Sequence, residues 1–356
     1  MKIIKFEKED KYIEDFLNIP KKLYDNKTLM QNEEEEKALL LEIHPLSKYF
    51  KLDKFIVYND DKPVGRFIIT TYDNDDTAYA GFFECINEKA VSDVIFNKIK
   101  EFSKEHGYKK VIGPVDASFW VKYRLKINNF DQTPYTGEPY NKDYYYKMFL
   151  DNQFTLNKRY ISNKYNCLSI NKSEKCGFKK RYNQFIEKGY TFTSPTKNTF
   201  EKCFREIYHM IIKLYSDFPV YKYIEEDDFV KQFSFFRHIV DYSFIKLVYK
   251  DKNPVAFLIG IPDYNNDLYK SLNVMDYIKI LLKRTVRSNN YVMLYMGVDK
   301  EHPGLAKAMT YTIMQKLKRK HSTSIGALIK DTNINKNYGK EDLNSEYEYV
   351  LLEYNL

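Results

Sequence analysis

The chain has 356 residues, of which 44% are hydrophobic, so it is long enough for one large domain or two ordinary ones with buried cores. Its net charge of +8 is a small excess of 57 basic over 49 acidic residues, which does not suggest a dedicated nucleic-acid binder. The four cysteines form no metal-ligand spacing and no window approaches a membrane span, so we expect a cytoplasmic protein without metal, disulfide framework or membrane association.

The first half of the chain predicts helices and strands in a definite order. Helical periodicity covers Glu7–Tyr24, and Phe55–Ile69 has the pattern of two strands joined by a polar turn. Ala78–Ile86 follows as a strand, and Tyr108–Val115 as another. Between these two strands, Asn87–Gly107 predicts a helix whose apolar face carries Val91, Ile95, Ile99 and Phe102.

The second half predicts the same order of elements. They are a helix over Thr199–Phe218, a hairpin over Ile245–Ile261, a strand over Tyr291–Val298, a helix over Pro303–Lys320, a strand over Ser322–Lys330 and a late strand over Glu346–Tyr354. A strand–helix–strand crossover implies a parallel pair of strands, and the hairpins add antiparallel ones. Each half therefore predicts a mixed sheet flanked by helices.

The two hairpins also repeat each other in sequence. Val57-Tyr58 aligns with Val248-Tyr249, and Pro63-Val64 aligns with Pro254-Val255 at the same offset. We therefore expect an α/β fold of two tandem lobes, residues 1–170 and 171–356, with the boundary in the polar stretch near Ser169–Lys180.

Several segments resemble the GNAT acyltransferase superfamily in its two-lobed tandem form, and their order carries more weight than any single one. They are Lys62–Phe67, Gly81–Asn87, Gly113–Ser118, Pro139–Phe154, Gly260–Asn266 and Leu328–Asn333. The resemblance implies that the strand before a crossover helix splays from its neighbour and pairs with the pantetheine arm of an acyl-CoA. It also implies that the diphosphate binds backbone N–H groups where that helix begins.

For the second lobe, the resemblance implies a site for acetyl-CoA or another acyl-CoA. Its residues would be Met296, Gly297, Val298, Gly304, Leu305, Ala306 and Lys307. When Gly304 and Ala306 are aligned with the two small residues of the family's loop, Glu301 stands where the family has Arg or Gln. In an alignment without gaps, Pro303 stands at that position, and Ala306 and Ala308 are the small residues. The first lobe's helix begins without glycine and with Glu88 in the turn, so we expect no CoA there.

The resemblance also implies a catalytic base and an acid that protonates the thiolate. Tyr338 is the candidate acid, with a surface or core tyrosine as the alternative. Glu84 and Asp263 are candidate bases. The alternatives are that Glu84 faces solvent or pairs with an arginine such as Arg66, and that Asp263 caps a turn.

Taken together, the resemblance implies an acyl-CoA-dependent N-acyltransferase acting on an amine of a small molecule or peptide in the cleft between the lobes. One alternative is a relative that takes its acyl group from aminoacyl-tRNA, for which a basic groove would be needed. Another is a ligand- or partner-binding module that kept the fold without the chemistry.

Overall fold

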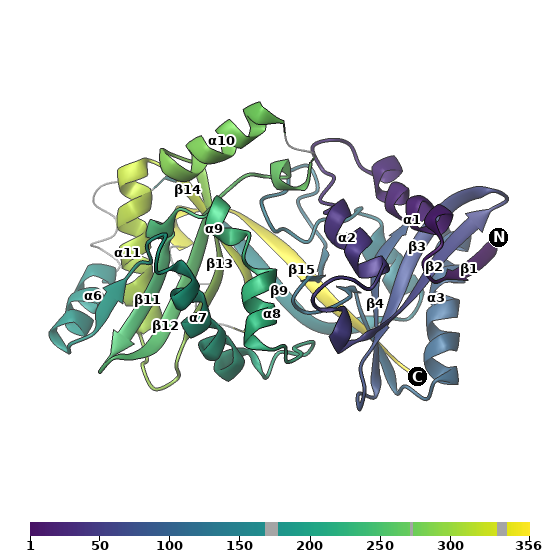
Figure 1. Cartoon of the computed structure of the whole chain (residues 1–356), viewed down its shortest axis with the longest axis horizontal. Coiled ribbons are helices and arrows are strands. Elements are labelled where there is room, and N and C mark those ends of the chain that lie inside the picture. Colours follow the sequence, from purple (N-terminus) through teal and green to yellow (C-terminus); the bar gives the residue numbers. More distant parts are fainter. Residues whose placement is uncertain (168–176, 271–272, 333–339) are drawn as a thin grey trace.

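The computed structural model describes residues 1–167, 177–270, 273–332 and 340–356. The two halves of the chain lie side by side, the first in purple and blue, the second in green and yellow (Figure 1). Helices cover both faces of a large sheet, and the N-terminus lies at the outer end of the first half. The predicted class, an α/β fold with two tandem lobes, is confirmed.

Strands of both halves join in a single sheet, which has 13 strands among the described residues. The order is β1-β2-β3-β4-β5-β15-β9-β14-β13-β12-β11-β10, with β8 attached to β15. The bounds are β1 Lys2–Phe6, β2 Lys51–Asn59, β3 Lys62–Thr71, β4 Thr77–Cys85, β5 Lys110–Gly113, β8 Leu125–Lys126, β9 Thr155–Tyr165, β10 Thr191–Thr193, β11 Ile245–Lys250, β12 Asn253–Pro262, β13 Asn290–Val298, β14 Thr323–Lys330 and β15 Leu343–Asn355. A separate two-stranded ribbon consists of β6 (Val115–Asp116) and β7 (Lys122–Tyr123).

The predicted helices are present with ends shifted by a few residues. In chain order the helices are α1 Asp10–Leu23, α2 Glu33–Leu40, α3 Lys89–Glu105, α4 Tyr145–Asp151, α6 Phe178–Glu187, α7 Phe200–Tyr215, α8 Glu226–Gln232, α9 Phe236–Ile239, α10 Val274–Thr285 and α11 Leu305–Lys320. The sequence did not predict α10, because its apolar residues are not confined to the buried face. Val274 and Leu281 are more than half exposed, whereas Ile280 is buried.

The hairpin repeat is confirmed in the backbone. The β2–β3 pairing shifts register after Val57, and the β11–β12 pairing shifts after the equivalent Val248. Asp60 and Asp251, at equivalent places in the two turns, both have positive φ, 53° and 50°. Equivalent irregularities at equivalent positions show that the repeat is one of backbone conformation as well as of residue type.

The predicted crossovers are confirmed too, since β4 pairs parallel with β5 and β13 pairs parallel with β14. Helices pack on both faces of each half. In the first half, α3 and α4 cover one face and α1 and α2 the other. In the second half, α6 and α11 cover one face, and α7 and α8 cover the other.

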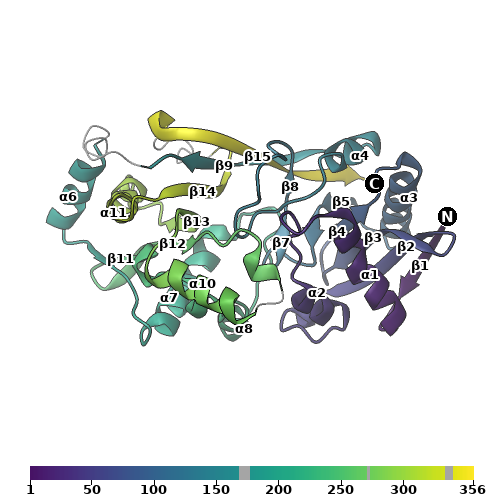
Figure 2. The ribbon, with the colours of Figure 1, turned by 90° about the horizontal axis from the view of Figure 1, so that it is seen from above.

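The two halves exchange their last strands. Strand β15, the end of the chain, pairs with β5 through Leu352–Asn355 and with β9 along most of its length. Strand β9 pairs on its other side with β14, so a strand from the first half completes the sheet of the second (Figure 2). The predicted lobe boundary near Ser169–Lys180 lies partly outside the described residues and stays a prediction. The sheet runs continuously from the strands of one half to those of the other.

Candidate functional site

The parallel pair β13–β14 opens part-way along its length. Register pairs run from Asn290 with Thr323 to Met293 with Gly326 and then stop. Strand β13 continues to Val298 and β14 to Lys330, so the two strands diverge. A bulge marks the same point, because Gly260 of β12 lies opposite Met293 while Ile259 lies opposite Tyr295. The opening is the splay that the family resemblance implied for this strand.

A cavity of about 700 Å³ occupies this opening and reaches both faces of the sheet. From one face it is lined by Ile211 and Phe233, and from the other by Ile313 and Met314. The first half contributes the segment from Phe119 to Arg124 and the turn at Thr136 and Gly137. The lining is mainly apolar and aromatic with a few polar groups, the usual character of a small-molecule site.

Helix α11 follows β13 after a short turn, and no side chain caps its N-terminus. The N-cap residue is Gly304, with φ of 87°, a conformation that favours glycine. The backbone N–H of Leu305 donates to the His302 carbonyl at 3.2 Å, whereas the N–H groups of Ala306 and Lys307 have no acceptor among the described residues. These free N–H groups and the helix dipole make this end favourable for an anion.

Cations gather near the start of α11. A Cβ on Gly304 would lie 3.2 Å from the Arg181 Nε, so the α6 guanidinium lies against this glycine. Lys307 lies over the Phe178 ring at 4.9 Å. Neither Arg181 nor Lys307 has an ion-pair partner in the described part of the chain. Arg181 therefore places a positive charge beside a loop that lacks the family's own Arg or Gln.

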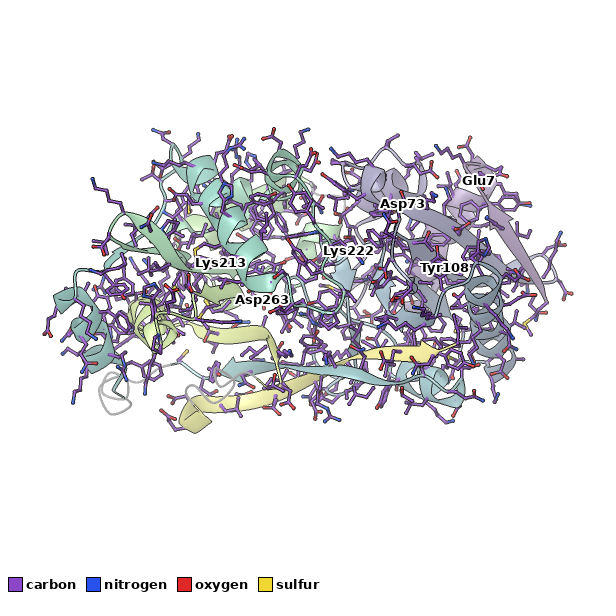
Figure 3. All side chains as sticks on the ribbon, turned by 90° about the horizontal axis from the view of Figure 1, so that it is seen from below. Glu7, Asp73, Tyr108, Lys213, Lys222 and Asp263 are labelled. Atoms are coloured by element: carbon purple, nitrogen blue, oxygen red, sulfur yellow. The ribbon has the colours of Figure 1, made fainter. Side chains whose placement is uncertain are left out.

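The acids of the loop have defined neighbours. Lys213 of α7 (Figure 3) pairs with Asp299, and this interaction lowers the pKa of Asp299. Glu301 is exposed, and its N–H donates to the Asp299 Oδ1 at 3.3 Å. His302 is hydrogen-bonded to the Tyr190 hydroxyl at 2.7 Å, so its ring is held in the turn. One acid of the turn is thus neutralised and the other faces solvent.

The residues predicted to bind the cofactor fall into two groups. Met296, Gly297 and Val298 line the cavity, and the Met296 carbonyl accepts a hydrogen bond from the Tyr215 hydroxyl at 3.1 Å. Gly297 is required by packing, because a Cβ there would lie 2.4 Å from Phe257. The second group, Gly304, Leu305, Ala306 and Lys307, forms the first turn of α11. The structure connects the two groups through the turn at Asp299–Pro303, and their role stays a prediction.

The equivalent opening in the first half is filled by the chain itself. Strand β4 extends beyond its last pair with β5, at Tyr79 and Ile112, but the backbone of Val115 and Asp116 occupies the space. A Cβ on Gly81 would lie 1.8 Å from the Val115 carbonyl oxygen. The Phe82 N–H donates to the Asp116 Oδ1 at 2.6 Å. This backbone N–H lies at the irregularity in the β3–β4 pairing, and it is therefore already hydrogen-bonded within the protein.

Glu84 lies on β4 of the first half and does not line the cavity between β13 and β14. It accepts hydrogen bonds from the hydroxyls of Tyr24 at 2.9 Å and Tyr145 at 2.6 Å. Burial raises the pKa of Glu84, and the nearby Arg66 partly offsets this effect. Arg66 itself forms its ion pair with Glu36 at 2.7 Å rather than with Glu84.

Asp263 also lies outside the cavity lining. It follows β12 and is buried, and it accepts hydrogen bonds from the Thr136 N–H and hydroxyl, the Asn265 N–H and the Asn290 side chain at 2.8 to 3.1 Å. It thus joins the turn at Thr136 in the first half to the second half. No hydrogen bond joins Asp263 to Glu84, and Tyr338 lies outside the described residues; the catalytic role of all three stays a prediction.

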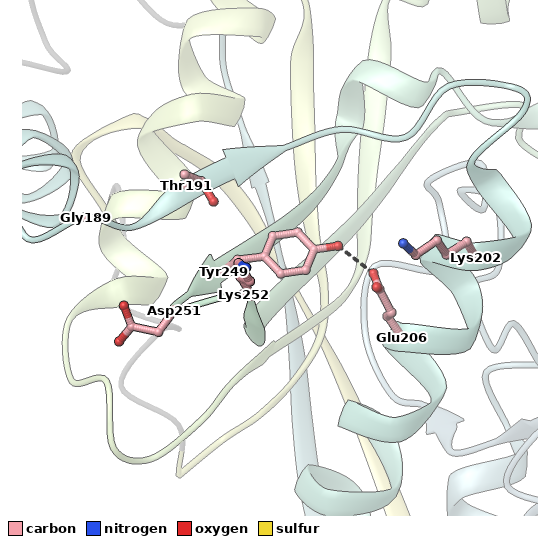
Figure 4. A pocket seen from close by; sticks show the side chains of 7 residues that line it. All are labelled: Gly189, Thr191, Lys202, Glu206, Tyr249, Asp251 and Lys252. Carbon is pink, nitrogen blue, oxygen red and sulfur yellow. Dashed lines mark hydrogen bonds between the residues drawn. The ribbon is translucent and has the colours of Figure 1, made fainter.

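A second hollow of about 500 Å³ lies at the other edge of the second half (Figure 4). It is lined by Gly189, Thr191, Lys202, Glu206, Tyr249, Asp251 and Lys252. The Tyr249 hydroxyl donates to Glu206 at 2.5 Å across it. Its lining comes from the β10–β11 edge of the sheet and from α7, and β12 separates this edge from the β13–β14 opening, so we do not assign it to the site.

The described ranges also bear on the expectations about metal and membrane. No group of three or more His, Cys, Asp or Glu side chains could hold a metal ion there. No helix within those ranges is both long and apolar enough to cross a membrane.

No family model and no curated protein sequence matches the chain. Among solved structures, it is similar to a tandem GNAT protein from the clavulanic acid biosynthesis pathway, with a TM-score of 0.55 and 8% identity, covering 99% of this chain and 98% of that one. It is also similar to the GCN5-related glucosamine N-acetyltransferase region of a fungal multi-domain GH3 β-N-acetylglucosaminidase, with a TM-score of 0.53 and 12% identity, covering 99% of this chain and 38% of that one. The chain therefore has the tandem GNAT fold that its sequence resembles; at these identities the likeness concerns the fold alone.

Three features of the site were missed by reasoning from sequence. Trp120 and Arg124 lie between the segments Gly113–Ser118 and Pro139–Phe154, in a stretch to which the sequence assigned no role, yet both line the cavity. Arg181 lies 123 residues before Gly304 in the chain, since 304 − 181 = 123, and no motif joins them. The single tryptophan and an arginine next to Tyr123 were visible signals in the sequence, but only the fold shows where they lie.

Proposed function

We propose that the protein is an acyl-CoA-dependent N-acyltransferase whose cofactor site is in the second half. The observation that carries the proposal is the opening between β13 and β14, which leads through Val298 to the uncapped start of α11. The pantetheine arm would lie along β13, and the diphosphate would meet the free N–H groups of Ala306 and Lys307. Arg181 and Lys307 would supply positive charge that the loop otherwise lacks.

The reaction is the attack of an acceptor amine on the thioester carbonyl. The new C–N bond forms as the C–S bond breaks, the amine loses a proton, and the thiolate of CoA gains one. The β13 backbone at Leu294, where the β12–β13 pairing has its bulge, would orient the thioester carbonyl. The cavity would hold the acceptor amine beside this carbonyl. Acetyl-CoA is the proposed donor, and another acyl-CoA would use the same contacts.

The first half would serve as a wall of the acceptor site and would bind no CoA. Its β4 opening is filled by Val115 and Asp116, which leaves no space for a pantetheine arm. The aminoacyl-tRNA alternative needs a basic groove, and the mainly apolar lining of the cavity does not favour it. The non-catalytic alternative differs from our proposal in predicting no turnover.

Titration calorimetry with acetyl-CoA tests the cofactor site. We expect saturable binding to the wild-type chain and roughly tenfold or greater weakening in Lys307→Glu, because the substitution places an acid where the diphosphate would lie. An acid in the first turn suits the helix dipole, so this variant should still fold. No binding at millimolar acetyl-CoA by a folded chain would refute the proposal.

The matched control is Arg319→Glu, which makes the same charge change on the exposed last turn of α11. It should bind acetyl-CoA like the wild type. Equal weakening in both variants would show that net charge rather than the start of α11 determines affinity. Release of free thiol in the presence of a panel of amines then separates a transferase from a module that only binds.

A further inference from the structure

The inference concerns Arg124, which lies between β7 and β8 and lines the cavity. Its φ is 96°, a left-handed conformation that is strained for a residue with a long side chain. Its N–H donates to the Pro114 carbonyl at 3.2 Å, which holds this backbone in place. The fold thus fixes an arginine at the wall of the cavity at some conformational cost.

The guanidinium of Arg124 is surrounded by aromatic rings rather than by acids. Its Cζ lies 3.8 Å from the centre of the Tyr123 ring and 4.1 Å from that of Tyr160. One Nη donates to the Tyr123 hydroxyl, and the buried Nε has no hydrogen-bond partner in the described structure. No carboxylate of the described residues forms an ion pair with it.

Unlike Arg124, the neighbouring cations on the same segment form ion pairs with carboxylates. Lys122 pairs with Asp116 at 2.9 Å, and Lys126 pairs with Glu138 at 2.8 Å, with both side chains of the latter pair fully buried. The chain therefore supplies a carboxylate for the cation on either side of Arg124 and none for Arg124. A largely buried charge without a counterion is unfavourable, so this arrangement is best explained if a ligand supplies the anion.

We propose that Arg124 binds the carboxylate of the acceptor, so that the substrate class is amines that carry a carboxylate. The assignment of the ligand as acceptor rests on the proposed transferase function. A planar guanidinium with free donors matches a carboxylate in a forked geometry. The Arg124 guanidinium fits a single carboxylate, and the nearby Phe119 and Trp120 fit an apolar or aromatic remainder.

The single tryptophan of the chain reports on this site directly, because Trp120 lines the same cavity. The test is to titrate the full chain with phenylacetate and with its neutral analogue phenylacetamide while recording Trp120 emission. We expect saturable binding of phenylacetate, roughly tenfold or more tighter than phenylacetamide, and loss of this preference in Arg124→Gln. Arg124→Lys, which keeps the charge without the planar fork, should keep part of it.

Arg319→Gln is the matched control, since it also removes an arginine but Arg319 is exposed on the last turn of α11 and does not line the cavity. It should leave the preference unchanged. Equal affinity for the two compounds, no binding of either, or an undiminished preference in Arg124→Gln would overturn the proposal. If Arg124→Gln does not fold, the proposal is tested by the preference of the wild type for phenylacetate over phenylacetamide and by the reduced preference expected in Arg124→Lys.

The titration uses no acyl-CoA and therefore separates this inference from the proposed function. Carboxylate preference without acetyl-CoA binding would refute the transferase but leave the anion site. Acetyl-CoA binding without carboxylate preference would refute the anion site alone. Where both hold, acetyl transfer to L-phenylalanine should exceed transfer to 2-phenylethylamine, and Arg124→Gln should remove the difference mainly through KM.

Discussion

At the scale of single residues, Lys246 on β11 is a buried lysine that forms no ion pair with the described residues. It is 8% exposed, and its ammonium donates to the Ser194 hydroxyl at 2.7 Å. Burial, together with the neighbouring Lys316, lowers the pKa of Lys246 to about 8 from its ordinary 10.5. The unfolded chain therefore binds more protons than the folded one between these values, so this residue makes stability rise with pH there.

We predict that Lys246→Met removes this pH dependence. The wild type should gain roughly 1 kcal/mol of unfolding free energy relative to the variant between pH 7 and pH 9, because Lys246 is then losing its proton in the folded state. Urea unfolding of both proteins at several pH values measures the difference. A constant difference, or one that grows in the opposite direction, would show that Lys246 is not the group responsible.

Residue types alone identified part of the site and missed the rest for a physical reason. The small residues Gly297 and Gly304 were predicted, because close approach and positive φ restrict which residues fit. Arg124 was not, because its significance depends on which carboxylates lie near it after folding. Adjacent Lys122 and Lys126 look equivalent to it in sequence and differ only through their contacts with Asp116 and Glu138.

At the scale of elements, the strand openings of the two halves, at β4–β5 and at β13–β14, are expected to tolerate a larger side chain at a glycine to different extents. A Cβ on Gly81 of β4 would lie 1.8 Å from the Val115 carbonyl oxygen, a backbone atom. A Cβ on Gly326 of β14 would meet its nearest neighbours, in Ile329 and Tyr165, at 3.6 Å, an ordinary contact. The first opening is closed by packed backbone, whereas the second has space.

We predict that Gly81→Ala lowers the free energy of unfolding by about 3 kcal/mol or more, because β4 or the Val115 segment must move. Gly326→Ala, the matched substitution in the other half, should change it by less than about 1 kcal/mol. Thermal and urea unfolding of the two variants measure the contrast. Comparable losses in both would contradict the view that only the first opening is filled.

Elements that repeat were predicted well, and elements without a partner in the other half were not. The hairpins and crossovers follow from periodicity that occurs twice, with the same turn positions at Asp60 and Asp251. The pairing of β15 with β5 did not follow, since local patterns fix a strand but not its neighbours. Helix α10 lacks the one-sided pattern on which helix prediction depends, because it exposes much of its apolar surface.

At the scale of the whole molecule, the halves are joined by more than the exchanged strands. Lys222 pairs with Asp75 of the first half at the junction (Figure 3), and the Trp120 indole N–H donates to the Lys222 carbonyl at 2.7 Å. Lys48 pairs with Asp228 at 2.8 Å across the same junction. The cavity is built from both halves, so the site depends on their being held together.

We predict that neither half folds independently when the chain is divided between residues 170 and 171. The fragment 1–170 would lack β15, which lies between β5 and β9, and the fragment 171–356 would lack β9, which covers β14. Each fragment would expose long unpaired strand edges, which favour aggregation over a cooperative fold. Co-expression of both fragments should restore a complex with the thermal transition of the intact chain. A sharp, cooperative unfolding transition in either fragment alone would show that the exchanged strands are dispensable, and that the predicted boundary separates autonomous domains.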